Sequence, residues 1–256
     1  CPFCAATIVI KGGTTATLHK PQYLLPFGID DAKAQENFKR WLKGLWFAPR
    51  NLNHYADNTN RLTGMYLPFW TFDCTTDSSY TGQRGENYTV SENYTAAENG
   101  KNVTRTRQVT KTRWYPASGS VRNTFDDLLI EATRSLKKNN LRALEPWDLK
   151  NLVPYNDKYL SGFRTETYGV DIKSSYEEAK QHMEPAIHSA IRKDIGGDQQ
   201  MIQFVNTTYH NPTFKHILLP VWLSAYRYNN KVYQFLINAR TGEVQGERPF
   251  SPAKIA

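Results

Sequence analysis

A long polar stretch around Asn99-Gly100 alternates its side chains with the period of a β-hairpin. Asn-Gly is the strongest short signal for a two-residue type I′ turn, because both central residues take a positive φ. With these two residues as the loop, each residue i of the first strand faces residue 199 − i of the second. Neither face of this ribbon is apolar, so we predict a solvent-exposed, two-stranded arm from about Ser79 to Tyr115.

The two faces of the predicted arm differ in chemistry. One face joins opposite charges or a cation and an aromatic ring: Glu98 with Lys101, Tyr94 with Arg105, Glu92 with Arg107, Tyr88 with Lys111 and Glu86 with Arg113. Over residues 87–95 and 104–112 the other face carries only Asn, Ser, Thr and Gln side chains. We expect the charged face, with Arg105, Arg107, Lys111, Arg113, Tyr88 and Tyr94, to serve as an interaction surface.

Apolar residues at helical spacing predict three helices, over residues 30–45, 123–136 and 171–195. Acidic residues at the start of the first helix suit its N-terminus. Gly196-Gly197 should end the third helix, and Pro185 should kink it or split it in two. Apolar or alternating stretches predict strands at residues 7–10, 14–18, 62–74, 201–209, 216–228, 231–238 and 243–245.

A weak internal repeat relates Met65-Tyr66-Leu67-Pro68-Phe69-Trp70 to Ile217-Leu218-Leu219-Pro220-Val221-Trp222. An extended segment and an amphipathic helix precede each copy, and a hairpin follows it. The proline in each strand favours an edge or bulge position. We therefore expect an α+β fold in which two strand–helix–strand–hairpin repeats surround an antiparallel sheet, with the long hairpin protruding.

This organisation divides the chain into four parts. Residues 1–19 would be the C-terminal half of a zinc-ribbon-like segment, residues 20–120 the first repeat with the arm, residues 121–250 the second repeat, and residues 251–256 the start of a linker or membrane-proximal segment. The chain begins at Cys1 without a Met, and we expect it to be an interior part of a longer protein.

Composition narrows the class of protein. A chain of 256 residues with 39% apolar residues can form a sizeable core, and a mean hydropathy of −0.62 excludes a mostly membrane-embedded protein. The net charge of +8 is compatible with nucleic acid or an anionic surface. The densest basic run, residues 101–113, faces carboxylates and tyrosines in the predicted register, which favours a structural ladder over a phosphate-binding strand.

Cys1-Pro2-Phe3-Cys4 is the motif with the clearest chemical content. Two cysteines at this spacing form a knuckle on one Zn²⁺, and a closed structural site needs two further ligands, which we expect upstream of Cys1. A redox pair and uncommitted cysteines are alternatives, although a redox pair normally opens a helix and this motif leads into an apparent strand. Cys74 is predicted to be a small buried hydrophobe.

Other polar groups carry structural interpretations. The histidines lack the spacing of metal ligands, and Asp126-Asp127 reads as a partner of a helix N-terminus. No phosphate-binding loop, nucleophile elbow, dinucleotide fingerprint or metalloprotease motif is present. We therefore expect a non-enzymatic protein.

The chain resembles a family of bacterial zinc-ribbon proteins whose members are often labelled primosomal protein N-prime-like or replication-helicase-like. The resemblance rests on these stretches: 23–27, 41–44, 46–49, 106–116, 218–222 and 238–249. It implies a zinc ribbon before this body, a membrane-spanning segment after residue 256 and a place at the cytoplasmic face of the membrane. Helicase motifs are absent from this sequence, so the helicase label does not carry over.

The sequence and the resemblance together lead to one expected function and one alternative. The expected function is that of a membrane-associated scaffold or adaptor that assembles proteins, as a homo-oligomer or within an envelope or stress complex, with zinc as its cofactor. The alternative is a nucleic-acid-binding module of a replication-type accessory protein that uses the basic strand.

Overall fold

The computed structural model describes residues 19–45, 62–98, 101–228 and 231–247. The chain divides into two compact units. The first comprises the segment up to Phe72 together with Asp127–Glu177 and the segment from Phe214 onward; the second comprises Asp73–Asp126 and Glu178–Thr213. Three long strands and one helix supply residues to both units.

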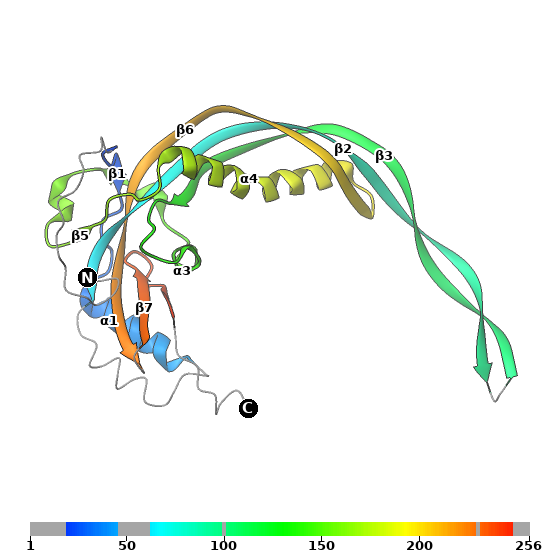
Figure 1. The fold of residues 1–256 in the computed structure, drawn as a ribbon, viewed down its shortest axis with the longest axis horizontal. Coiled ribbons are helices and arrows are strands. Elements are labelled where there is room, and N and C mark those ends of the chain that lie inside the picture. The colour runs from blue at the N-terminus through cyan, green and yellow to red at the C-terminus, as the bar shows by residue number, and fades with distance from the viewer. Residues whose placement is uncertain (1–18, 46–61, 99–100, 229–230, 248–256) are drawn as a thin grey trace. The chain divides into compact units, whose positions relative to one another are not determined.

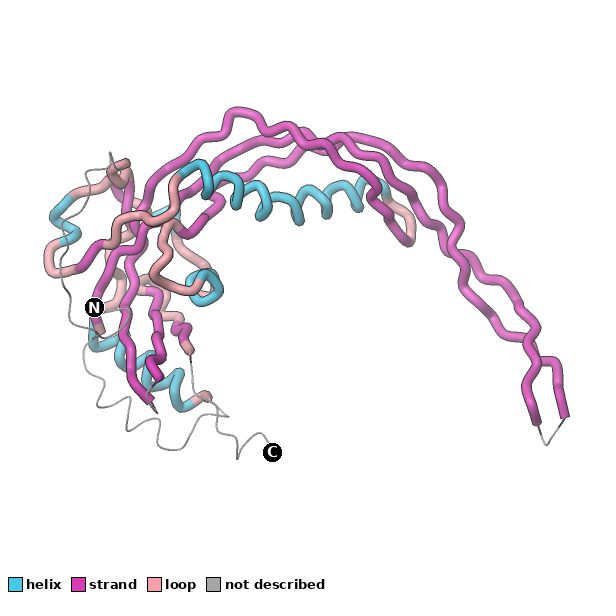
Figure 2. Tube along the Cα trace, viewed as in Figure 1, coloured by secondary structure: helices cyan, strands magenta, loops and turns pink. Residues whose placement is uncertain are grey.

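Strands dominate the described residues (Figure 2). They are β1 (Tyr23–Leu24), β2 (Thr63–Glu98), β3 (Lys101–Glu131), β4 (Val153–Pro154), β5 (Arg164–Thr165), β6 (Gln199–Tyr228), β7 (Lys231–Asn238) and β8 (Val244–Gly246). The helices are α1 (Asp31–Lys43), α3 (Lys138–Arg142) and α4 (Ile172–Ile195), with 3₁₀ turns at Leu149–Asn151 and Asp157–Leu160. The strands form one sheet with the order β3-β2-β6-β1-β4, while β5 pairs with β2, and β7 pairs with both β6 and β8 (Figure 1).

The expected α+β class with an antiparallel sheet is wrong, because the described residues form a β-rich, mixed sheet. Strand β1 lies parallel to β6, and β5 lies parallel to β2. The strands that hold most of the sheet run for 36, 31 and 30 residues. Such lengths far exceed the usual five or six residues of a strand, and local patterns give no sign of where such a strand ends.

The predicted helix over residues 123–136 is also wrong. Strand β3 continues through this stretch to Glu131, and only the short α3 follows it. A short apolar run fits a buried strand as well as a helix, so pairing with β2 decides the conformation here. The turn expected near Pro116 is likewise strand; β3 lies at the end of the sheet order, where a proline is tolerated.

Helices α1 and α4 agree with the prediction. Asp30 caps α1 by accepting a hydrogen bond from the Lys33 amide at 2.8 Å, and Ala34, Phe38 and Leu42 form its buried stripe. Helix α4 begins after Asp171 and runs without a break through Pro185, so the expected split does not occur; a kink, the other effect considered, stays a prediction.

The core of the first unit packs around the Leu-Pro stretches of β2 and β6. Its largest cluster of buried side chains contains Leu25, Met65, Leu67, Phe69, Leu136, Leu141, Leu144, Trp147, Ile217, Leu219, Val221, Leu223 and Leu236. Strand β2 lies between β3 and β6, so the edge position expected for Pro68 is wrong. A bulge, the other position considered, stays a prediction.

In the second unit α4 lies along β2. Its buried residues Ala179, Met183, Ile187, Ile191 and Ile195 recur every four residues, as one face of a helix requires. The Tyr80 hydroxyl donates to Asp194 at 2.6 Å, and burial and this carboxylate raise the pKa of Tyr80 to about 12. Gly119 faces the same ring so closely that a Cβ would lie 2.7 Å from both the Tyr80 hydroxyl and Asp194.

Candidate functional site

The register predicted for the arm is confirmed by side-chain hydrogen bonds on its polar face. Asn93 accepts from Thr106 at 2.9 Å, Ser91 from Gln108 at 3.0 Å and Asn87 from Thr112 at 2.8 Å. Each pair obeys the 199 − i rule set by the Asn-Gly turn. The same register extends into the sheet, where Arg122 donates to Asp77 at 2.7 Å.

The charged face of the arm is internally paired, partly with the predicted partners and partly with diagonal neighbours. Glu92 forms the predicted ion pair with Arg107 at 3.7 Å and binds the diagonal neighbour Lys111 more closely, at 2.7 Å. This contact lowers the pKa of Glu92 and raises the pKa of Lys111. Long side chains reach diagonal neighbours as readily as facing ones.

The aromatic contacts show the same offset. The guanidinium of Arg107 lies over the Tyr94 ring at 5.5 Å, and that of Arg113 over the Tyr88 ring at 5.1 Å. The sequence register had placed Arg105 and Lys111 opposite these rings. Arg105 is exposed on the same strand.

Past the N-terminal end of β6 the described part of the arm consists of two strands, β2 and β3. Strand β6 begins at Gln199, whose side chain donates to Asn87, and the Asn87 amide donates to Asp198 at 2.7 Å. From this point β2 and β3 continue without a third strand among the described residues (Figure 1). Within the described part of the sheet β3 pairs only with β2, so its outer backbone edge is open along the arm.

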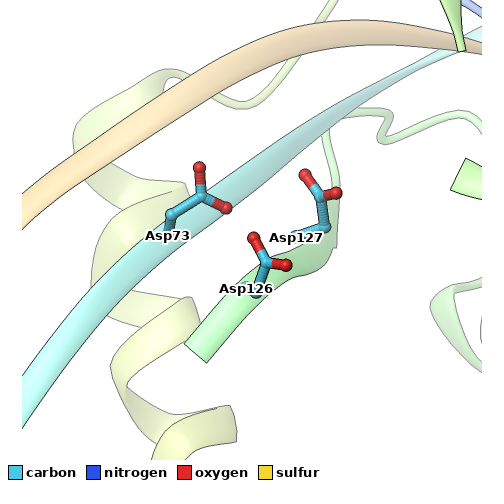
Figure 3. Close-up of side chains that lie close together, drawn as sticks. All are labelled: Asp73, Asp126 and Asp127. Carbon is cyan, nitrogen blue, oxygen red and sulfur yellow. The ribbon is translucent and has the colours of Figure 1, made fainter. Parts of the chain in front are cut away.

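Three aspartates lie close together, Asp73 on β2 and Asp126 and Asp127 near the C-terminal end of β3 (Figure 3). Carboxylate oxygens of Asp73, Asp126 and Asp127 lie within 4.8 Å of one another. The helix N-terminus expected to hold the last two is absent, since both lie in β3. Thr213 donates to Asp73 at 3.1 Å, and Lys215 binds Asp127 at 2.7 Å.

An all-carboxylate donor set favours a hard cation such as Ca²⁺ or Mg²⁺ over the zinc expected from the sequence. An acidic cluster on its own does not make a metal site, and we assign no ion to it. The predicted zinc ligands Cys1 and Cys4 lie outside the described residues. Cys74 is buried, as predicted.

Two tryptophans of the first unit share one hydrogen-bonding framework. The Trp222 indole donates to the Ile29 carbonyl oxygen at 3.1 Å, and the Trp70 indole donates to the Val170 carbonyl oxygen at 3.1 Å. Each carbonyl lies in a turn just before a helix, with Asp30 capping α1 and Asp171 accepting from the Ser174 amide before α4. We call these two places the Trp222 turn (residues 27–30) and the Trp70 turn (residues 168–171).

The backbone around the two turns repeats the same bonds. Gly28 and Ile29 both donate to the Ala239 carbonyl oxygen, as Gly169 and Val170 do to that of Ala132. Ala239 and Ala132 in turn donate to the carbonyl oxygens of Pro220 and Pro68, both at 3.1 Å. The sequences Phe-Gly-Ile-Asp and Tyr-Gly-Val-Asp carried this signal, which sequence reasoning missed.

The side chains around the two tryptophans differ. Phe27 and Tyr168 meet their tryptophans edge to face at 5.1 and 5.2 Å. The second ring differs: Phe163, from just before β5, stacks on Phe27 at 3.9 Å, whereas His216, on β6, lies 4.8 Å from Trp70.

Space explains that difference. Gly64 leaves the room that the Phe163 ring occupies, since a Cβ at Gly64 would overlap this ring. Phe214 adds a further ring on the Trp70 side, at 6.0 Å. Trp70 is fully buried, whereas a shallow pocket of about 440 Å³ opens beside Trp222.

His216 is buried and held in one orientation. Its Nδ1 lies 2.8 Å from the His19 carbonyl oxygen, so Nδ1 carries the proton and donates. The other ring nitrogen, Nε2, has no hydrogen-bond partner among the described residues. Burial lowers the pKa of His216, because a charged imidazole would lose its hydration.

Comparison with known proteins yields one distant relative. The chain is 27% identical over 237 residues to the Bacillus subtilis (strain 168) protein named "Uncharacterized protein YdjG", covering 92% of this chain and 66% of that protein, slightly less than two thirds of its length. No family model matches the chain, and no solved structure matches it significantly. None of the described helices has both the length and the apolar character needed to cross a membrane.

Proposed function

We propose that this chain is a non-enzymatic docking domain that binds an extended segment of a partner protein along the outer edge of β3 on the arm. The observation that carries the proposal is a two-stranded arm whose side chains hold its own register while its outer backbone edge has no partner strand in the part of the chain that the structure describes. Open edges accept a further strand through main-chain hydrogen bonds.

The stability of an isolated ribbon supports the same function. Two strands alone are marginally stable in water, and a third strand or a covering element stabilises them. The arm has neither among the described residues beyond Asn87 and Thr112. An added strand would supply both hydrogen bonds and cover.

The charge of the arm indicates the chemistry of the partner. Between Arg84 and Arg113 the chain carries six Lys or Arg residues and three Glu residues. Ion pairs within the arm neutralise part of this charge and leave it net positive. We therefore propose an acidic partner strand, in which Asp or Glu alternates with apolar residues.

Amide hydrogen exchange tests this proposal with a defined probe. A twelve-residue peptide of alternating Glu and Val is added to the full chain, and the exchange of β3 amides between Thr104 and Arg113 is followed by NMR. The expected result is new protection at alternate residues, because only the outward amides gain partners. Equal protection by a Lys-Val peptide, or none by the Glu-Val peptide, would contradict the proposal.

A pair of variants tests whether peptide binding depends on the arm itself or on the net charge of the chain. Arg105→Glu should weaken binding of the Glu-Val peptide several-fold, because Arg105 is exposed on the arm. Lys150→Glu changes the net charge by the same amount at a 3₁₀ turn in the first unit and should leave binding unchanged.

Nucleic-acid binding through the same cations is the second candidate. It predicts that a 20-base-pair duplex binds the chain with an affinity that falls steeply with salt, since each neutralised phosphate releases counterions. The pairing of Arg107, Lys111 and Arg113 within the arm argues against it. Duplex binding that is steeply salt-dependent and lost in Arg105→Glu would replace the docking proposal.

A further inference from the structure

The pocket beside Trp222 combines aromatic rings with carboxylates. The rings of Phe27, Phe163 and Trp222 line it together with Asp30 and Asp31 at the start of α1, and Gly28 and Ile29 complete the lining. Its volume of about 440 Å³ lies within the range of small-ligand sites. Lining of this kind attracts an organic cation, because ring faces have a negative electrostatic potential and carboxylates carry a negative charge.

Each of these two carboxylates has one oxygen that can accept a hydrogen bond from a ligand. Asp30 uses Oδ1 to cap α1, and Asp31 uses Oδ2 to accept from Gln35 at 3.1 Å. The second oxygen of each carboxylate makes no hydrogen bond within the described part of the chain. Two full negative charges exceed the roughly half positive charge of a helix N-terminus, so the rim is net negative.

Two described cations near this rim, Lys33 and Arg240, bind other groups. Lys33 binds Glu36 at 2.8 Å, on the turn of α1 that follows the pocket. Arg240, whose side chain lies near Gly28, donates to Asp148 and to the Pro26 carbonyl oxygen. Neither side chain lines the pocket.

The related site at Trp70 shows what this framework does when it is closed. There the same indole-to-carbonyl bond is surrounded by Tyr168, His216 and Phe214, and Trp70 is fully buried. The Trp222 turn carries the same bonds around open space and two carboxylates. The framework alone therefore does not require the pocket.

We propose that this pocket binds the guanidinium group of an arginine side chain of a partner protein. A guanidinium is planar and weakly hydrated, so it stacks on aromatic rings and donates forked hydrogen bonds to a carboxylate. A lysine ammonium is a compact, strongly hydrated charge and uses the rings less well. This site lies in the first unit and goes beyond the docking function proposed for the arm.

The test uses N-acetyl-arginine amide as the probe and the full chain labelled with ¹⁵N. The indole N–H resonance of Trp222 should shift in a saturable way at millimolar probe, while that of Trp70 should stay in place. The neutral isostere N-acetyl-citrulline amide should bind at least tenfold more weakly. Equal binding of citrulline, or equal shifts of both indoles, would overturn the proposal. Equal binding of N-acetyl-lysine amide would overturn the choice of guanidinium.

A matched pair of variants separates binding from folding. Asn is as good an N-cap as Asp, so Asp30→Asn and Asp171→Asn should both retain their helices. Asp30→Asn combined with Asp31→Asn should weaken binding of the arginine probe about tenfold, whereas Asp171→Asn should leave it unchanged. Equal losses in both variants would overturn the proposal. Arg105→Glu on the arm should not affect this titration, so the two proposals can fail separately.

Discussion

The Trp70 turn and the Trp222 turn have the same backbone bonds and different surroundings. Both indoles donate to a turn carbonyl at 3.1 Å, and both turns donate two amides to an alanine carbonyl oxygen. The Trp70 turn is closed by His216 and Phe214, whereas a pocket opens at the Trp222 turn. Hydrogen bonds therefore fix the position of the tryptophan, and the neighbouring side chains decide whether the place is core or binding site.

Removing each tryptophan gives the largest expected effect and measures this difference directly. Trp70→Ala should lower the free energy of unfolding by about 5 kcal/mol, because a fully buried ring leaves a cavity. Trp222→Ala should cost about 3 kcal/mol, because the pocket admits water to its site. Urea unfolding measures both values. A larger loss for Trp222 would break the comparison.

Closing the room at Gly64 should damage the Trp222 turn. A Cβ in Gly64→Ala would overlap the Phe163 ring, and we expect a loss of about 1–3 kcal/mol together with weaker binding of the arginine probe. Gly169→Ala is the control, since its added Cβ would have its nearest neighbour 3.5 Å away. Stability and titration are measured on the same samples, and unchanged probe binding in Gly64→Ala would contradict the part given to Phe163.

The first buried residue of the helix is apolar in α1 and polar in α4, so exchanging the two residue types measures the cost of a buried hydroxyl. Ala34 on α1 and Ser175 on α4 are both fully buried, and Ser175 Oγ has no hydrogen-bond partner among the described residues. Ser175→Ala should raise the free energy of unfolding by up to about 1 kcal/mol, and Ala34→Ser should lower it by about 1–2 kcal/mol. Thermal and urea unfolding check the opposite signs; a loss in Ser175→Ala would reveal a partner for this hydroxyl.

The smallest expected effect is a pH dependence of stability, which His216 at the Trp70 turn can produce and Phe163 at the Trp222 turn cannot. Burial holds the pKa of folded His216 below its ordinary 6.5, so the unfolded chain takes up a proton first as the pH falls. The stability from neutral His216 is complete above the unfolded pKa and declines from about pH 6.5 down to the folded pKa. His216→Phe should remove this part of the decline in melting temperature between pH 7 and 5.

His188→Phe is the control for this pH dependence. His188 lies half-buried on α4 in the second unit, 3.8 Å from Glu184. This variant should retain the acid-induced decline that His216→Phe loses. The same slope in both variants would show that His216 does not titrate in this range.

Local signals predicted the arm well. The Asn-Gly turn sets the register, and alternation in an antiparallel pair then fixes which side chains share a face. The pairs Asn93–Thr106 and Asn87–Thr112 agree with this reasoning. Glu92 kept its predicted partner Arg107 and added the diagonal Lys111, and the cation over Tyr94 shifted diagonally, because long side chains choose between several neighbours within reach.

The helix caps could be predicted from the sequence equally well, but the candidate pocket could not. Asp30 precedes an apolar stripe, so the start of α1 follows from sequence. The pocket joins Phe27, Phe163 and Trp222, which are far apart in the chain and meet only because β1 and β5 lie parallel to β6 and β2. Parallel pairing between distant segments leaves no local pattern.

The amino-acid sequence by itself determined the register of the arm and the caps of α1 and α4, since each depends on a local turn or on residues within a few positions. Tertiary structure decided that residues 123–131 are strand, that the sheet is mixed and that one tryptophan turn is open. These outcomes depend on which distant segment supplies the neighbouring side chain, and the free energy of that contact outweighs local preference.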